Sequence, residues 1–202
     1  SEIIDKVFPW WIAQILDALE TAHSADPPII HRDIKPENIG IAVDAEIKIL
    51  DFGVAKRGPA KTQGVGTPLY IAPEIIAGES HGARADVYSV GAIIYEVLSP
   101  QHKPPSYKEV ERQLALEVPF ESFPPKWAKV LAMCLQTDPE LRATTTELLK
   151  LPLFARSRAP RQSFLAQYFP NQEESPDMLD WQQAAPPPRD ARRRAADACD
   201  EQ

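Results

Sequence analysis

Apolar side chains recur at helical spacing from Asp5 to His23, which predicts an amphipathic helix with one buried face. Pro9 suits the first turn of this helix, whereas Pro27 and Pro28 prevent the helix from continuing. Residues 85–98 are apolar at almost every position, and this pattern predicts a second helix that is buried on most of its faces. Weaker helical patterns cover residues 107–116, 125–136 and 145–151.

Short β-prone runs separate the first two long helices. They cover residues 29–30, 39–41 and 47–50, and the segment Val43-Asp44-Ala45-Glu46 can close a hairpin between the last two runs. Residues 53–66 are rich in Gly, Lys, Pro and Thr without any periodicity, so we expect an exposed loop there. The whole pattern predicts a mainly α fold of the α+β type, in which helices dominate and short β-hairpins interrupt them.

The pattern changes after Phe154. Residues 155–202 contain many of the chain's 21 prolines and no sustained amphipathic stretch, which predicts a proline-rich, disordered tail. We therefore expect a folded domain over residues 1–154 and a tail over residues 155–202.

Composition and charge narrow the classes of function. The 202 residues are 44% hydrophobic, which is enough for a sizeable core, and the formal net charge of −7 argues against nucleic acid or an anionic membrane as a partner. No run of about 18 apolar residues and no signal-peptide pattern is present. The two cysteines, Cys134 and Cys199, lie far apart, so we expect an intracellular protein, cytoplasmic or nuclear, without a disulfide framework.

Three short motifs carry chemistry. The run His31-Arg32-Asp33-Ile34-Lys35-Pro36-Glu37-Asn38 precedes Asp51-Phe52-Gly53, which in turn precedes Ala72-Pro73-Glu74. Their order and spacing resemble the catalytic loop, the metal loop and the end of the activation segment of eukaryotic-type protein kinases. Lysine two positions after the catalytic aspartate resembles the serine/threonine-specific branch of this family. The resemblance covers about residues 5–154 and implies the C-terminal lobe of the kinase fold.

The resemblance implies a role in phosphoryl transfer for five of these residues. Asp33 and Lys35 would be catalytic, because Asp33 would accept or orient the proton of a substrate hydroxyl and Lys35 would screen the γ-phosphate. Asn38 and Asp51 supply oxygen ligands of the kind that Mg²⁺ prefers. Lys35, Glu37, Asn38 and Asp51 together form the implied ATP-binding set, so the expected cofactors are ATP and Mg²⁺.

Other matching residues have implied structural or regulatory roles. His31 and Phe52 would stack in the hydrophobic spine between the two lobes of a kinase. Asp86 would hold the backbone of the catalytic loop from below, and Arg32 would pair with a phosphorylated activation loop.

The activation segment and its ion-pair partner contribute four further candidates. Glu74 would form a buried ion pair with Arg142, which lies outside the segment and anchors it, and Thr67 would hydrogen-bond toward Asp33 and Lys35. Thr62 is the candidate site for phosphorylation by an upstream activating kinase, and an unmodified threonine in a solvated basic loop is an equal alternative.

Two features depart from the family pattern. No Gly-x-Gly-x-x-Gly occurs in the chain, and Ser1 stands at or just before the helix that precedes the catalytic loop, so we expect a C-lobe without its N-lobe. A fragment and a gene that lost its nucleotide lobe both explain this, and the absence of an initiator methionine favours the fragment. Gly40 stands where relatives carry a large aliphatic side chain beneath the adenine, which predicts weakened nucleotide binding.

Two hypotheses of function follow. The first is a serine/threonine protein kinase that transfers the γ-phosphate of ATP to protein hydroxyls, with negligible activity in the 202-residue chain alone. The second is a non-catalytic, pseudokinase-like module that binds proteins. Glu37 and Glu96 match positions that contact basic substrate residues in some kinases, but glutamate is also common there for structural reasons.

Overall fold

The computed structural model describes residues 3–42, 45–51, 53–58 and 69–155, which belong to one compact unit within Ser1–Gln162. Phe52, Thr62, Thr67, Cys199 and most of the predicted tail (residues 156–202) lie outside the described residues.

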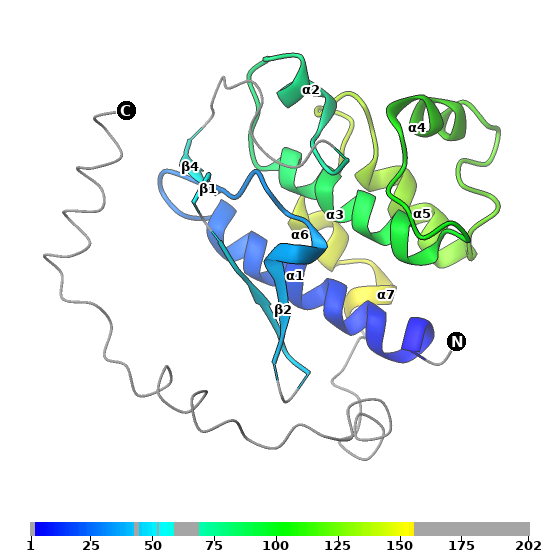
Figure 1. The fold of residues 1–202 in the computed structure, drawn as a ribbon, viewed down its shortest axis with the longest axis horizontal. Coiled ribbons are helices and arrows are strands. Elements are labelled where there is room, and N and C mark those ends of the chain that lie inside the picture. Colours follow the sequence, from blue (N-terminus) through cyan, green and yellow to red (C-terminus); the bar gives the residue numbers. More distant parts are fainter. Residues whose placement is uncertain (1–2, 43–44, 52, 59–68, 156–202) are drawn as a thin grey trace, which may run out of the picture. The chain divides into compact units, whose positions relative to one another are not determined.

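Helices form most of the described structure (Figure 1). A π-helical turn, Ile3–Val7, leads into α1 (Phe8–His23), and Pro9 lies in the first turn of α1 as predicted. The remaining helices are α2 (Pro73–Ile76), α3 (Arg84–Leu98), α4 (Tyr107–Leu114), α5 (Pro125–Cys134), α6 (Thr145–Leu149) and α7 (Pro152–Ala155). All five predicted helices are confirmed, and α4, α5 and α6 each end two residues before the predicted end.

Two antiparallel two-stranded sheets complete the fold. The hairpin predicted from the β-prone runs is present: β2 (Ile39–Ile41) pairs with β3 (Ile47–Ile49), and Gly40 lies opposite Lys48. The predicted loop over residues 53–66 is wrong in part, because β4 (Lys56–Arg57) pairs with β1 (Ile29–Ile30). Backbone hydrogen bonds between distant segments therefore override the irregular local composition there.

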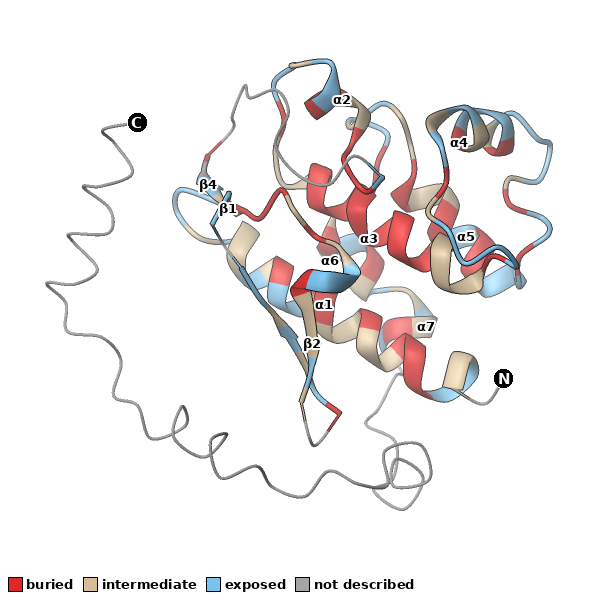
Figure 2. Cartoon of the chain, in the orientation of Figure 1, coloured by how far each residue is buried: buried red, intermediate tan, exposed pale blue. Residues whose placement is uncertain are grey.

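The core lies around α3, whose residues are buried on almost every face as the apolar run predicted (Figure 2). Helix α5 packs against α3, and Trp127 at its start is completely buried. A Cβ atom added to Gly91 would lie 2.6 Å from the Cβ of Cys134, so glycine is required where these two helices meet.

Helix α1 contacts the β2–β3 hairpin through two hydrogen bonds. The indole Nε1 of Trp11 donates a hydrogen bond to the Ala45 carbonyl at 2.9 Å, and the Ile47 amide donates to Gln14 Oε1 at 3.1 Å. These contacts fix the tip of the hairpin, whose two ends carry Asn38 and Asp51.

Candidate active site

The catalytic loop, residues 31–38, is held by a buried carboxylate from α3. The backbone amide of His31 donates to Asp86 Oδ2 at 2.9 Å, and the amide of Arg32 donates to Oδ1 at 2.7 Å. Asp86 is completely buried, and it makes the backbone contacts that the resemblance implied. Arg32 has a φ of 67°, a left-handed conformation that costs a non-glycine residue about 1–2 kcal/mol. The two hydrogen bonds to Asp86 hold this conformation immediately before Asp33.

His23 is a third donor to the same carboxylate, and no motif pointed to it. Its Nε2 lies 2.8 Å from Asp86 Oδ2, and its side chain is 7% exposed. Because a carboxylate only accepts hydrogen bonds here, Nε2 of His23 is the donor. The end of α1 is thereby tied to the catalytic loop.

The buried His31 ring joins the catalytic loop to the end of the hairpin. Its Nδ1 accepts a hydrogen bond from the Asp33 amide at 3.3 Å, so its Nε2 donates to the Leu50 carbonyl at 3.1 Å. Leu50 directly precedes Asp51, so one imidazole ring touches the backbone beside both aspartates of the implied machinery. The guanidinium of Arg32 adds a hydrogen bond to the Val54 carbonyl.

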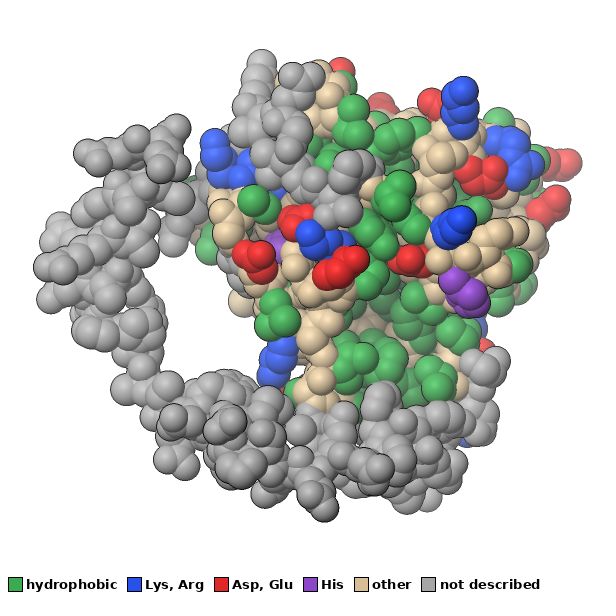
Figure 3. Space-filling view, viewed as in Figure 1, with side chains coloured by type: hydrophobic (Ala, Val, Ile, Leu, Met, Phe, Trp, Pro, Cys, Tyr) green, Lys and Arg blue, Asp and Glu red, His purple; other side chains and the backbone are tan. Residues whose placement is uncertain are grey.

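Asp33 is the centre of the polar cluster. Its Oδ2 accepts from Lys35 Nζ at 2.8 Å and from Asn38 Nδ2 at 3.0 Å. The side chains of Asp33 and Lys35 are 14% and 22% exposed, so both are positioned by protein and still open to solvent. Figure 3 shows acidic and basic side chains gathered at the centre of this face, above the β2–β3 hairpin.

Neighbouring carboxylates raise the pKa of Lys35. The hydrogen bond that Lys35 donates to Asp33 is the largest cause, and the charges of Asp33, Glu37 and Asp51 add to it. The ammonium of Lys35 is therefore stabilised where three carboxylates converge. A cation in this place is suited to holding a phosphate beside the carboxylate of Asp33.

The side chains of Asn38 and Asp51 fit a magnesium ion. Asn38 Nδ2 donates to both the carbonyl and the carboxylate of Asp33, and its Oδ1 has no hydrogen-bond partner among the described residues, so this oxygen is available as a metal ligand. Asp51 is exposed, and only one of its carboxylate oxygens accepts a hydrogen bond from a described residue, the Gly53 amide at 2.9 Å. The Leu50 amide donates a hydrogen bond to the Asn38 carbonyl at 2.8 Å. This bond keeps Asn38 and Asp51 close together at the open end of the hairpin, where both could bind one metal ion.

A second group of carboxylates lies beside the catalytic loop. The Tyr70 hydroxyl donates to Glu96 Oε2 at 2.8 Å. The pKa of Tyr70 is raised, first by burial and then by Glu96 and Glu37. Since both glutamates act on one hydroxyl, Glu37 and Glu96 lie in the same neighbourhood, although Glu37 itself is exposed.

Glu74 and Arg142 form an ion pair deep in the lobe, away from the polar cluster. Their two hydrogen bonds, NH1 to Oε1 at 2.6 Å and NH2 to Oε2 at 2.9 Å, are bidentate, and both side chains are almost fully buried. Arg142 also donates to the carbonyls of Arg84 and Gln136. This ion pair between α2 and the loop before α6 is the one that the resemblance implied.

The edge of the site beside Gly40 is open and apolar. A Cβ atom at Gly40 would lie 3.4 Å from Leu50 Cδ1, which is an ordinary contact. Ile41, Leu50 and Val54 are 44%, 49% and 36% exposed. Phe52, Thr62 and Thr67, which belong to the implied spine and activation segment, lie outside the described residues.

This arrangement is the one expected of phosphotransferases that act on proteins. It combines a helical lobe, Asn38 and Asp51 at the ends of the hairpin, the pair of Asp33 and Lys35, and the buried ion pair of Glu74 and Arg142. The family model of the protein kinase domain matches residues 3–154. The chain therefore belongs to the eukaryotic-type serine/threonine protein kinase family.

Individual relatives agree with this family. The chain is 36% identical over 145 residues to the G2-specific protein kinase nimA of Emericella nidulans, covering 66% of this chain and 20% of that protein. It is 35% identical over 156 residues to a RAC family serine/threonine-protein kinase homolog of Dictyostelium discoideum, covering 72% and 34%. It is 34% identical over 158 residues to Aurora kinase of Schizosaccharomyces pombe, covering 73% and 43%. The chain thus spans less than half the length of these relatives.

Helices long and apolar enough to cross a bilayer do not occur among the residues that the structure describes.

Proposed function

We propose that the protein to which these residues belong is a serine/threonine protein kinase that transfers the γ-phosphate of ATP to hydroxyl groups of protein substrates. The observation that carries the proposal is the position of Asp33. Its carboxylate is fixed by Lys35 at 2.8 Å and Asn38 at 3.0 Å, yet it remains accessible to a substrate hydroxyl.

Each residue then has a distinct part. Asp33 orients the substrate hydroxyl and accepts its proton, and Lys35 screens the charge of the phosphoryl group. Oδ1 of Asn38 and the carboxylate of Asp51 would hold Mg²⁺, which when bound neutralises the charge of the ATP phosphates. Asp86 and His31 act indirectly, because they hold the backbone amides of Asp33 and of the two residues before it.

The 202 residues do not contain the glycine-rich loop or the strand lysine with which kinases hold ATP. We therefore expect no measurable kinase activity from this chain by itself. We also expect an intracellular protein, cytoplasmic or nuclear, with a protein substrate and with Thr62 as the candidate site for an upstream kinase.

The proposal is tested in the longest natural protein that contains these residues. Asp33→Asn should reduce transfer of phosphate from ATP to a basic protein substrate by at least about 10³-fold, since the general base is lost. Asp17→Asn, a matched change at an exposed position of α1, should leave the rate unchanged. Equal rates for the Asp33→Asn variant and the unmodified protein would refute the assignment.

A non-catalytic binding module is the second candidate, and Gly40 is the observation that favours it. Without a side chain there, and with Ile41 and Leu50 exposed beside it, adenine would lack its usual apolar support. A thermal-shift titration of the same protein with Mg-ATP separates the two candidates: a kinase is stabilised in a metal-dependent manner, and a binding module is not.

A further inference from the structure

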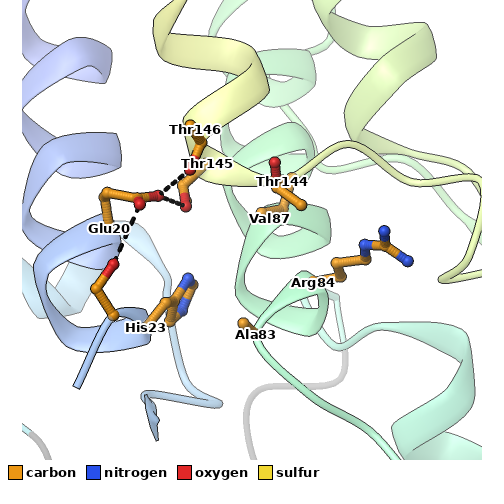
Figure 4. A pocket seen from close by; sticks show the side chains of 9 residues that line it. Glu20, His23, Ala83, Arg84, Val87, Thr144, Thr145 and Thr146 are labelled. Atoms are coloured by element: carbon orange, nitrogen blue, oxygen red, sulfur yellow. Dashed lines mark hydrogen bonds between the residues drawn. The ribbon is translucent and has the colours of Figure 1, made fainter. Parts of the chain in front are cut away.

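A pocket of about 200 Å³ lies where the end of α1, the first turn of α3 and the residues around the start of α6 meet (Figure 4). The roles proposed above for phosphoryl transfer do not use it. Its volume is below the roughly 300–1,000 Å³ of pockets that enclose drug-sized ligands, so it suits a single side-chain head group. The residues that matter for its chemistry are Glu20, His23, Ala83, Val87, Thr145 and Thr146.

One wall of the pocket carries an ionised carboxylate. Glu20 accepts hydrogen bonds from the hydroxyls of Thr145 and Thr146, which Figure 4 draws as dashed lines, and from the hydroxyl of Ser24. The bond from Thr145 is the largest cause that lowers the pKa of Glu20, so its charge persists despite partial burial. The carbonyl end of α1 adds negative partial charge to the same wall.

His23 adds an acceptor to this wall. When the ring is neutral, its Nδ1 presents a lone pair, because Nε2 donates to Asp86, and Nδ1 has no hydrogen-bond partner among the described residues. The ring itself is almost fully buried, with 7% of its side chain exposed, so its orientation is fixed.

Arg84, on the opposite wall, does not neutralise the charge of Glu20. Arg84 NH1 is bonded to the Pro139 carbonyl and to Glu140 Oε2, both at 3.0 Å, and its guanidinium extends away from Glu20 in Figure 4. Asp86 in the first turn of α3 balances the positive end of that helix. Ala83 and Val87 supply an apolar surface that suits the methylene groups of a long side chain.

We propose that this pocket binds the guanidinium group of an arginine side chain from a protein partner, and that occupancy stabilises the catalytic loop through His23 and Asp86. A planar guanidinium has five donors in a fixed array, which matches several acceptors at once. Its charge complements Glu20, and its methylene groups lie against Ala83 and Val87.

Two hydrogen-bonded residues, His23 and Asp86, connect the pocket to the catalytic loop. A donor bound to His23 Nδ1 polarises the ring and strengthens the hydrogen bond from Nε2 to Asp86 Oδ2. The same carboxylate accepts the amides of His31 and Arg32, which lie directly before Asp33. This second half of the inference rests on the proposed function, whereas binding in the pocket does not.

Binding is tested on the 202-residue chain by NMR titration of its backbone amides with butylguanidinium. N-Butylurea has nearly the same shape and no charge, so it serves as the matched probe. We expect butylguanidinium to shift the amides of residues 20–24 and 144–146, and the urea to bind roughly tenfold more weakly or worse. Equal binding of the two probes, or tighter binding of inorganic phosphate than of butylguanidinium, would overturn the proposal.

Variants locate the site. Glu20→Gln should weaken butylguanidinium binding by roughly tenfold, whereas Asp17→Asn, one turn earlier on the same helix and exposed, should not change it. Equal affinity of the Glu20→Gln variant and the unmodified chain would overturn the proposal. All of these measurements are made without ATP, so their failure is distinct from a failure of phosphoryl transfer.

Amide hydrogen exchange tests the coupling. Saturation with butylguanidinium should slow exchange of the His31 and Arg32 amides, and unchanged exchange there would overturn the coupling. His23→Gln should retain the donor to Asp86 and keep both amides protected, while His23→Leu should speed their exchange. If both variants exchange like the unmodified chain, His23 does not position the catalytic loop.

Discussion

Polar side chains have opposite environments in two regions of the lobe: the packed region around α3, Glu74 and Arg142, called here the base, and the solvent-accessible cluster of Asp33, Asn38 and Asp51, called here the cleft. In the base, Glu74 and Arg142 are buried and bonded to each other in a bidentate pair. In the cleft, Asp51 is exposed and Asn38 keeps an oxygen free of described hydrogen-bond partners. The first arrangement holds chain segments together, whereas the second leaves ligand positions open. The difference separates residues whose polar atoms hold the fold together from residues whose polar atoms remain open to solvent.

Asp86 connects the two regions. It is completely buried in α3, but its carboxylate holds the amides of His31 and Arg32 at the floor of the cleft. The positive φ of Arg32, at 67°, and of Asp51, at 56°, occur at this boundary. Strained backbone of this kind persists only where surrounding contacts determine it, and here the rigid base supplies those contacts.

The largest expected effect comes from breaking the base. Arg142→Met should lower the free energy of unfolding by about 3–5 kcal/mol, because Glu74 would keep a buried charge without its partner. Chemical denaturation of the 202-residue chain measures this change. Arg112→Met is the matched control: Arg112 is 65% exposed and paired with Glu109, so its loss should cost about 1 kcal/mol or less. Equal losses in the two variants would remove the distinction between base and surface.

The base was also the region that sequence patterns described best. Residues 5–23 and 85–98 have enough periodic positions for their helices to be predicted. In the cleft, two short motifs singled out Asp33, Asn38 and Asp51 as candidates. Helical periodicity cannot reveal α2 or α7, because each is only four residues long and begins at a proline.

Contacts between distant segments were not predictable from local patterns. Strand β4 forms only because it pairs with β1, from which it is separated by the catalytic loop and the hairpin. His23 and Asp86 are 63 positions apart, and nothing in the sequence around His23 indicated its partner. The pairing depends on where α1 ends relative to α3, which packing of the whole lobe decides.

A smaller effect, confined to the cleft, is expected at Gly40. If the longest natural protein that contains these residues binds ATP as proposed, Gly40→Leu should tighten Mg-ATP binding roughly tenfold, because the added methyl and methylene groups cover apolar adenine surface. The exposed Leu50 side chain, 3.4 Å from the position of a new Cβ, can move aside. Calorimetric titration measures the affinity, and Gly40→Ala should give an intermediate gain. An unchanged dissociation constant in both variants would show that this position does not contact the nucleotide.

Two tyrosines of the base, Tyr88 and Tyr107, differ in whether their hydroxyl groups have a hydrogen-bond partner. The buried Tyr88 hydroxyl has no hydrogen-bond partner among the described residues, whereas the Tyr107 hydroxyl donates to the Ile71 carbonyl at 2.6 Å. Tyr88→Phe should therefore raise the free energy of unfolding by about 1 kcal/mol, and Tyr107→Phe should lower it by about 1 kcal/mol. Urea denaturation compares them directly. If both variants changed the free energy of unfolding in the same direction, the presence of a hydrogen-bond partner would not determine how a buried hydroxyl in the base affects stability.

The smallest effect concerns Glu20, at the edge of the base, and it depends on pH. Hydroxyl donors, Thr145 first, lower its folded-state pKa below the ordinary value of 4.5. A carboxyl group with a lowered pKa contributes stability that is fully present above its unfolded-state pKa and is lost as the pH falls through the folded-state value.

Unfolding free energies measured from pH 6 downward should thus converge for the unmodified chain and the Glu20→Gln variant once the pH is well below 4.5. Asp17→Asn, at an exposed position of the same helix, is the matched control for the loss of one carboxylate. A constant difference between the Glu20→Gln variant and the unmodified chain across this range would mean that the hydroxyls bind the protonated and ionised forms of Glu20 equally well. In that case the carboxylate would not be held in its charged form by α6, and this edge of the base would resemble the exposed cleft rather than the Glu74–Arg142 pair.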